Sequence, residues 1–364
     1  MQLQGLTIIL TLKDRVSFTH RWMQYMNDIK CPYKILIADG GEDKSIEAHL
    51  LDSSNYPDLD YEYIRYSYDV TLKDYLRKLD NVLSRVNTKY LLNADNDDFY
   101  LFDRIQTILS FLDKNEDYVA CRGLLVNLSV MKRSGEARMA QGDHYLAFST
   151  HANSIENDDA FDRVDVLCRD MSKYDYYGNW YSVLRTSAML EVWKSIVKLE
   201  ISEMIVNEML THILINMRGK TKIFTWPFYI RQSSTSQFGD TLVVNNEFLE
   251  RCLINNNLSK FINAIETLIP FKSQADKEHV LKSVAAWFEV FIYNICLRDL
   301  SEQSNHYRFK KWLKRFPIIG LWALKIYHRI FYKATNIKSK HVILKEIEPY
   351  ILLKNLEKTG LNSL

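Results

Sequence analysis

The sequence predicts an α/β fold, in which a mostly parallel β-sheet with flanking helices is followed by an all-helical C-terminal domain. In roughly the first hundred residues, short apolar runs alternate with amphipathic helical patterns, as in a parallel sheet with crossover helices. Beyond about residue 245 strand signals cease and helical periodicity continues to the end. We therefore predict two domains, at residues 1–244 and 245–364.

The predicted elements of the N-terminal half follow one another closely. Residues 6–12 form an apolar run typical of a buried strand. The helix after it places Phe18, Trp22 and Met26 on one face. Further strands are predicted at residues 33–38, 61–66 and 89–94, with helices at 46–51 and 72–86. We expect Asp69 or Thr71 to cap the helix at 72–86.

The second half is less regular. Residues 134–179 are polar and predict a long loop region, which is often functional inside a compact domain. A strand at 180–183, helices at 187–197 and 202–217, a C-cap at Gly219 and a strand at 221–226 ended by Pro227 are predicted next. The C-terminal helices are predicted at residues 247–269, 279–300, 307–334 and 345–358.

Acidic residues follow two of the predicted strands. Asp39 comes after the second strand, and Asp95, Asp97 and Asp98 come after the fourth. Ligands of parallel sheets bind beyond the carboxyl ends of the strands. Carboxylates at positions i and i+2 suit Mg²⁺ or Mn²⁺, and their crowding is costly without a cation. We predict a Mn²⁺ or Mg²⁺ site at Asp95 and Asp97.

Two alternatives remain for the acidic residues. The whole segment can be a solvated turn whose aspartates cap the helix that follows. Asp98 alone is as well suited to capping that helix as to contacting a metal.

These segments resemble the GT-A glycosyltransferases, particularly the inverting family 2 group. Residues 7–15 look like the opening strand of that Rossmann-like fold and its Thr-x-x-Arg-like turn. Residues 37–41 are similar to its Asp-Gly-Ser turn, with Gly41 in place of serine. Asp95-Asn96-Asp97-Asp98 resembles its Asp-x-Asp-Asp donor motif. The resemblance covers residues 6–231.

The resemblance implies roles for the strand-end residues. Thr11, Asp14 and Arg15 would line the nucleotide pocket, and Asp39 would accept a hydrogen bond from the base. Asp95 would contact the ribose or the metal, and Asp97 would ligate the metal. Arg231, after a late strand, would lie near the diphosphate.

The resemblance also implies an acidic general base on a helix of the second half. Glu208 lies eleven residues before Gly219, which fits the family spacing. Glu203 is the second candidate. The family often has Glu-Asp where this chain has Asn207-Glu208. Independently of the family, inverting transfer needs one carboxylate to deprotonate the acceptor hydroxyl.

Three basic residues, Lys73, Arg77 and Lys78, lie on the helix before the acidic strand. We favour the solvent face of an amphipathic helix for them, and keep Lys78 as a candidate for donor binding.

The aromatic segment at residues 176–181 predicts either an acceptor platform or the start of a core strand. His144 and His151 are interpreted as structural, with a lid over the donor as the alternative.

The segment at residues 307–340 contains ten Lys and Arg and no Asp or Glu, interleaved with aromatic residues. It predicts either binding to an anionic membrane surface or an ordinary helical domain with solvated basic residues.

A net charge of +2 and acidic clusters elsewhere argue against nucleic-acid binding. No apolar stretch reaches spanning length and no basic leader precedes residue 6. The five scattered cysteines suit reduced thiols. We expect a cytoplasmic protein, with peripheral association at the inner face of the cell membrane as an option.

The sequence therefore predicts a metal-dependent, inverting glycosyltransferase of the hexosyltransferase type. It would use a nucleotide-sugar donor and a hydroxyl of a glycan or lipid-linked acceptor, in cell-surface polysaccharide synthesis. One alternative is a non-catalytic sugar- or nucleotide-binding module, which would not need Glu208. Another is a nucleotidyltransferase, which normally carries a glycine-rich loop after its first strand. Residues 12–15 contain no glycine.

Overall fold

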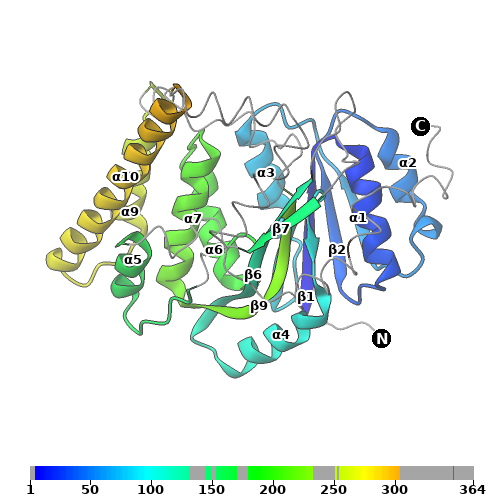
Figure 1. Ribbon diagram of the computed structural model, residues 1–364, viewed down its shortest axis with the longest axis horizontal. Helices are drawn as coiled ribbons and strands as arrows, with labels where there is room; N and C mark the ends of the chain where they lie inside the picture. Colours follow the sequence, from blue (N-terminus) through cyan, green and yellow to red (C-terminus); the bar gives the residue numbers. More distant parts are fainter. Residues whose placement is uncertain are drawn as a thin grey trace.

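The computed structural model describes residues 5–130, 144–148, 153–169, 179–232, 251, 254–303 and 347. In this part of the chain nine strands form one sheet in the order β3-β2-β1-β4-β8-β6-β9-β5, with β7 paired to β6. Helices flank the sheet on both faces (Figure 1). The predicted α/β class is confirmed.

Four parallel strands form the N-terminal half of the sheet. They are β1 (Leu6–Leu12), β2 (Lys34–Asp39), β3 (Tyr61–Arg65) and β4 (Tyr90–Asp95). β1 lies between β2 and β4, with Leu12 beside Asp39 and Thr11 beside Asp95. The strands agree with the predicted ones to within one or two residues, and their register places both aspartates at one edge of the sheet.

The connecting helices are α1 (Val16–Asp28), α2 (Ser45–Leu51) and α3 (Leu72–Leu83). The side chain of Thr71 caps α3 in a capping box with Asp74, which decides between the two predicted caps. α3 packs against α6 (Thr186–Lys198), and α6 packs against α7 (Met204–Arg218). In Figure 1 these three helices lie to the left of β1 and β2, on the side opposite α1 and α2.

The antiparallel part of the sheet differs from the prediction. β6 (Tyr118–Val130) was not predicted, and β8 (Val183–Arg185) begins where a strand was expected to end. β9 (Lys220–Gln232) runs through Pro227 instead of ending there. The β6–β9 register shifts next to Pro227, and such an irregularity tolerates a residue without an amide hydrogen. β5 (Phe99–Tyr100) pairs with the end of β9.

The predicted loop at residues 134–179 contains two elements. β7 (His144–Phe148) pairs with β6, and α5 (Ala160–Arg169) packs against α7. The Arg163 guanidinium on α5 donates to the main-chain oxygens of Asn216 and Met217, near the last turn of α7. The loop prediction was wrong here because a ten-residue helix among polar residues has a weak periodic signal.

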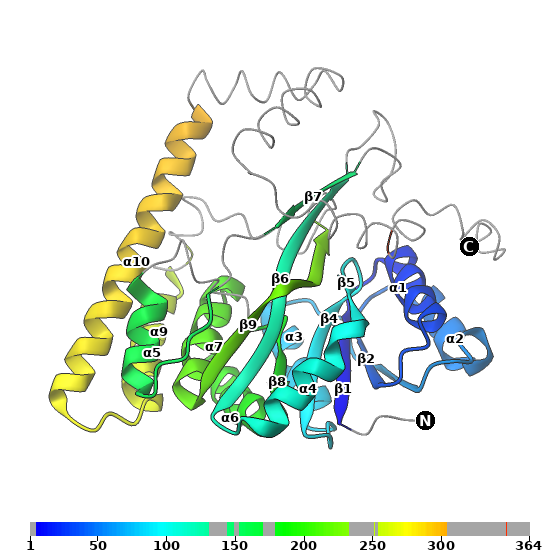
Figure 2. The ribbon, with the colours of Figure 1, turned by 60° about the horizontal axis from the view of Figure 1, so that its bottom comes forward.

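Beyond the sheet the described chain is helical. α9 (Asn257–Leu268) begins after Asn256, whose φ is 52°, so the predicted helix at 247–269 does not run unbroken. α10 (Gln274–Gln303) is longer than predicted. α9 packs on α7 and α10 packs on α5, as Figure 2 shows. None of the helices in the described ranges combines the length and apolarity needed to cross a membrane.

Some predictions fall outside the described residues. They are the helices at 307–334 and 345–358, apart from Ile347, and the basic segment at 307–340. The domain division at residue 245 stays a prediction. Cys31, Cys121 and Cys168 are buried free thiols. The reduced state expected of all five cysteines stays a prediction.

A buried histidine predicts acid sensitivity of the fold. His20 on α1 lies 3.2 Å from the Tyr56 hydroxyl and in edge contact with the His49 ring. Burial, with the nearby His49, lowers the pKa of His20 from 6.5 to about 4. Between those values the unfolded chain binds the proton and the folded chain does not, so stability falls as pH falls through this window.

We expect His20 to account for a loss of about 2 kcal/mol of unfolding free energy between pH 7 and pH 5. Urea unfolding at both pH values measures it. His20→Phe should reduce the difference between the two pH values, whatever its effect on stability at pH 7. An unchanged difference would show that His20 is not the group responsible.

Candidate active site

The loops after β1 and β2 are joined by the Asp14 carboxylate. Asp14 Oδ1 accepts hydrogen bonds from the main-chain nitrogens of Glu42 and Asp43, at 2.7 and 2.9 Å. Asp14 and Arg15 both have left-handed backbones, with φ of 57° and 61°. This strained turn leads directly into α1, whose N-cap is Arg15. The predicted residues Asp14 and Arg15 therefore lie next to the Asp39 turn.

Gly41 allows the two loops to approach. Its main-chain nitrogen donates to Asp39 Oδ1 at 2.8 Å. A Cβ at Gly41 would lie 2.6 Å from the Asp14 nitrogen, closer than Cβ atoms are found to other atoms. The serine usual in the resembled motif would therefore force the Asp14 loop to move.

Asp39 is buried and held from β3. Its Oδ2 accepts from the Tyr63 hydroxyl and from Arg65 Nη1, both at 2.7 Å. Arg65 also donates to the Gly41 oxygen. These contacts fix the carboxylate at the end of β2. Its predicted bond to a nucleotide base stays a prediction.

Three aspartates lie at the end of β4, and each has a different partner. Asp95, the last residue of the strand, is half-buried, and Asp97 and Asp98 after it are buried. Asp95 Oδ2 accepts from the Tyr181 hydroxyl at 3.1 Å, and Asp97 Oδ2 accepts from Arg15 Nη2 at 2.9 Å. Asp98 accepts from the Tyr229 hydroxyl and, at 2.7 Å, from the Gln232 nitrogen. Asp98 therefore anchors β9. It does not cap the helix that follows, whose N-cap is Arg104, so this one of its two suggested roles is excluded.

Crowding and burial change the acidity of this cluster. Burial, and next the charge of Asp97, raise the pKa of Asp95 to about 6. The same two causes raise the pKa of Asp98 well above its usual range. The charge of Arg231 lowers the pKa of both groups, so this predicted donor-site residue lies beside the cluster.

A second arginine reaches the cluster from inside the protein. Arg21 is buried and donates to the Asp97 main-chain oxygen at 2.8 Å and to Gln232 Oε1 at 2.7 Å. Arg21 was not among the predicted site residues, although it lies between Phe18 and Trp22, which are buried on α1. Guanidinium groups thus supply part of the positive charge that we had expected a metal ion to provide.

The carboxylates of Asp95 and Asp97 fit a divalent metal in one respect. Both are hard oxygen ligands, and Mg²⁺ commonly uses one or two carboxylates together with substrate phosphates. Among the residues that the structure describes, no group of three or more His, Cys, Asp or Glu side chains could hold a metal. A metal here would complete its coordination with water molecules or with oxygen atoms of a ligand.

The two candidate bases have different surroundings. Glu208 is half-buried on α7, and its charge contributes to raising the pKa of Tyr75 and of Tyr181. Burial and then Asp95 are the larger causes for both hydroxyls, so Glu208 and Asp95 lie near the same two side chains. Glu203, just before α7, is buried and paired with Arg251 Nε at 2.9 Å.

Thr11 belongs to the same neighbourhood, because its side chain is hydrogen-bonded to the Tyr75 hydroxyl. The structure thus brings Thr11, Asp95 and Glu208 around two tyrosines. Tyr181 also stacks on Tyr229, with ring centroids 4.1 Å apart. Trp180 and Tyr181 are both buried, which favours the core interpretation for this end of the aromatic segment.

Lys78 corrects the interpretation of its helix. It is not on the solvent face: it is buried, ion-paired with Asp69, and donates to the Leu12 oxygen at 2.9 Å. Burial lowers the pKa of Lys78 and raises that of Asp69. Lys78 therefore stabilises the end of β1 through its hydrogen bond to Leu12. Its predicted contact with a donor stays a prediction.

The structure does not describe the side chains of two other predicted features, the start of the aromatic segment and the two histidines His144 and His151. Residues 176–178 and His151 lie outside the described residues, and only the backbone of His144 is described, in β7.

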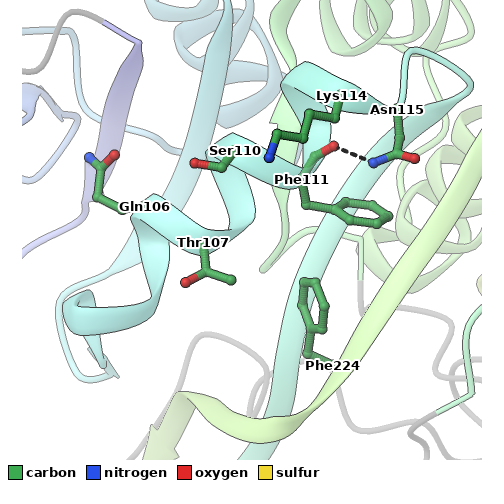
Figure 3. Close-up of a pocket in the computed structure, with 7 residues that line it drawn as sticks. All are labelled: Gln106, Thr107, Ser110, Phe111, Lys114, Asn115 and Phe224. Atoms are coloured by element: carbon green, nitrogen blue, oxygen red, sulfur yellow. Dashed lines mark hydrogen bonds between the residues drawn. The ribbon is translucent and has the colours of Figure 1, made fainter.

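A separate groove lies away from these carboxylates. It has a volume of about 480 Å³ and lies between α4 (Ile105–Lys114) and Phe224 of β9 (Figure 3). Its walls are formed by Gln106, Thr107, Ser110, Phe111, Lys114, Asn115 and Phe224. None of the predicted site residues lines it.

The comparisons with known proteins show the fold. No protein-family model matches the chain, and no curated protein sequence matches it. The crystal structure of S. aureus TarS 1–349 is similar with a TM-score of 0.50 and 11% identity, over 99% of this chain and 93% of that chain. The same TarS segment in complex with UDP and with UDP-GlcNAc matches with TM-scores of 0.50. The resemblance to family 2 in particular stays a prediction.

Gly41→Ser tests the close approach of the two loops. We expect a melting temperature lower by several degrees, equivalent to roughly 1–3 kcal/mol, because the added Cβ displaces Asp14. Gly5→Ser is the matched control, since a Cβ there would meet only Leu109, at an ordinary 3.9 Å. Equal melting temperatures for the two variants would contradict the steric argument.

Lys78→Met should destabilise the protein by about 3–5 kcal/mol, because Asp69 would be left buried and uncompensated. The double variant Lys78→Met with Asp69→Asn should recover part of this loss. Denaturant unfolding of the wild type, both single variants and the double variant gives the coupling energy. Additive losses would show that the pair does not act as a unit.

Proposed function

We propose that the protein is a glycosyltransferase that moves a sugar from a nucleotide-sugar to a hydroxyl group. One observation carries the proposal: Asp39, Asp95, Asp97 and Glu208 lie around the carboxyl edge of a sheet whose fold is shared with a protein solved with UDP-GlcNAc. Open α/β sheets bind ligands at that edge. The donor proposed for this chain is accordingly a nucleoside diphosphate sugar.

The donor would lie between the ends of β1, β2 and β4. The turn at Thr11, Asp14 and Arg15 would line the nucleotide, and Asp39 would accept from the base. The start of α1 and the guanidinium groups of Arg15 and Arg231 supply positive charge for a diphosphate. Mn²⁺ or Mg²⁺ on Asp95 and Asp97 would neutralise the leaving diphosphate.

Glu208 is the proposed general base. It would take the proton of the acceptor hydroxyl as that oxygen attacks the anomeric carbon. The bond from that carbon to the diphosphate oxygen breaks in the same step, so the configuration inverts and no covalent sugar–enzyme intermediate forms. Glu203 is poorly suited to this role, since both its oxygens face Arg251.

The finer parts of the proposal rest on the sequence. The acceptor is a glycan or a lipid-linked oligosaccharide in cell-surface polysaccharide synthesis, and the transferred sugar a hexose. Residues 307–340 would place the enzyme at the inner face of the membrane, through their basic and aromatic side chains. Binding of the full chain, and of a chain ending at residue 304, to anionic vesicles separates this role from an ordinary helical domain.

The donor is identified first, by a thermal-shift screen of UDP-, GDP- and dTDP-sugars with and without Mn²⁺. The wild type should be stabilised by one nucleotide class. Absence of any shift with every nucleotide would contradict the proposal.

Glu208→Gln tests the base. We expect kcat to fall about 10²- to 10⁴-fold with the donor Kd unchanged, because only proton removal from the acceptor is lost. Glu203→Gln is the control: its melting temperature should fall, as the pair with Arg251 weakens, with a much smaller change in kcat. If Glu203→Gln loses turnover while keeping its melting temperature, and Glu208→Gln stays active, the assignment is wrong.

A further inference from the structure

Arg15 makes an ion pair with the aspartate that is expected to bind metal. Its Nη2 lies 2.9 Å from Asp97 Oδ2, and the side chains are 26% and 5% exposed. The guanidinium carbon also lies 4.4 Å from the centre of the Phe18 ring. A partly exposed cation from the first loop is therefore paired with an almost fully buried carboxylate.

The two arginines at Asp97 differ in how firmly they are held. Arg21 is buried and binds the main-chain oxygen of Asp97, so it supports the turn without occupying a carboxylate oxygen in that bond. Arg15 binds the carboxylate itself, and its side chain is partly exposed. The main chain of Arg15 is fixed, because its oxygen accepts from the Phe18 and Thr19 nitrogens. Breaking the bond from Arg15 to Asp97 Oδ2 therefore requires movement of the Arg15 side chain and not of its main chain.

We propose that the Arg15 guanidinium acts as an internal stand-in cation, which a divalent metal displaces from Asp97 when the donor binds. The inference rests on the proposed function, because it assumes a metal and a diphosphate at this edge of the sheet. A metal ion and a guanidinium cannot share one carboxylate oxygen without strong repulsion. Displaced from Asp97, Arg15 lies at the start of α1, where it can bind phosphate oxygens.

The exchange has a thermodynamic consequence. Metal alone must break the Arg15–Asp97 pair, so it binds weakly to the protein without donor. A diphosphate offers Arg15 a new anionic partner and thereby favours the exchange. Metal and nucleoside diphosphate should therefore each strengthen the binding of the other, by the same factor.

The test measures Mn²⁺ binding to the full chain without any donor, by the electron paramagnetic resonance signal of free Mn²⁺. Arg15→Gln should bind Mn²⁺ roughly 5- to 10-fold more tightly than the wild type, the size of a typical coupling between sites. Arg77→Gln, an exposed residue on α3, makes the same change of net charge and should stay within about 2-fold of the wild type. Asp97→Asn should remove the binding in either background.

The second measurement adds UDP, the nucleoside diphosphate bound in one of the similar structures. UDP should strengthen Mn²⁺ binding to the wild type more than to Arg15→Gln. Equal or weaker Mn²⁺ binding by Arg15→Gln without UDP overturns the exchange, as does an equal effect of UDP on both proteins.

These outcomes are separate from the fate of the proposed function. Sugar transfer by the wild type, with unchanged Mn²⁺ affinity in Arg15→Gln, contradicts the exchange alone. No transfer with any donor, together with tighter Mn²⁺ binding by Arg15→Gln, contradicts the function and leaves the exchange in place.

Discussion

The compensation of buried negative charge at the end of β4 is the constraint on which the rest of this site depends. Asp95 is half-buried and Asp97 and Asp98 are buried, all within four residues, and each needs a donor from elsewhere in the chain. α1 supplies Arg15 and Arg21, the end of β9 supplies Tyr229 and the Gln232 nitrogen, and the segment before β8 supplies Tyr181. The cluster thus joins both halves of the sheet.

Compensation of buried negative charge also explains the polar residues around the neighbouring strands. Asp39 is balanced by Arg65 and Asp69 by Lys78, each across a different loop. Gly40 and Gly41 let these loops approach, since a Cβ on Gly40 would lie 2.5 Å from the Asp69 carboxylate. The carboxylates at this edge already have partners within the protein. A ligand that bound there, as proposed above, would have to exchange some of these partners.

Prediction from the sequence succeeded where the periodic signal was strong. The parallel strands and the helices between them were predicted because each buries a continuous apolar run or one apolar face. β6, the full length of β9 and α5 were not predicted. The helix α5 has a weak periodic signal, and β6 and β9 depend on their pairing with each other. β9 continues past Pro227 only because β6 provides a partner with a shifted register, and that pairing joins residues about a hundred positions apart.

The sequence by itself determined the alternation of strands and helices, and with it the edge at which Asp39 and the Asp95–Asp98 cluster lie. These follow from local apolar patterns and from the geometry of parallel sheets. Only the tertiary structure decided which charges meet. Glu203 and Glu208 look alike in the sequence, yet Glu203 pairs with Arg251 while Glu208 lies near the tyrosines of the acidic cluster. Lys78 and Arg77 are neighbours on α3, yet one is buried and the other exposed. Burial and pairing arise from contacts between segments distant in the chain, and no local pattern contains them.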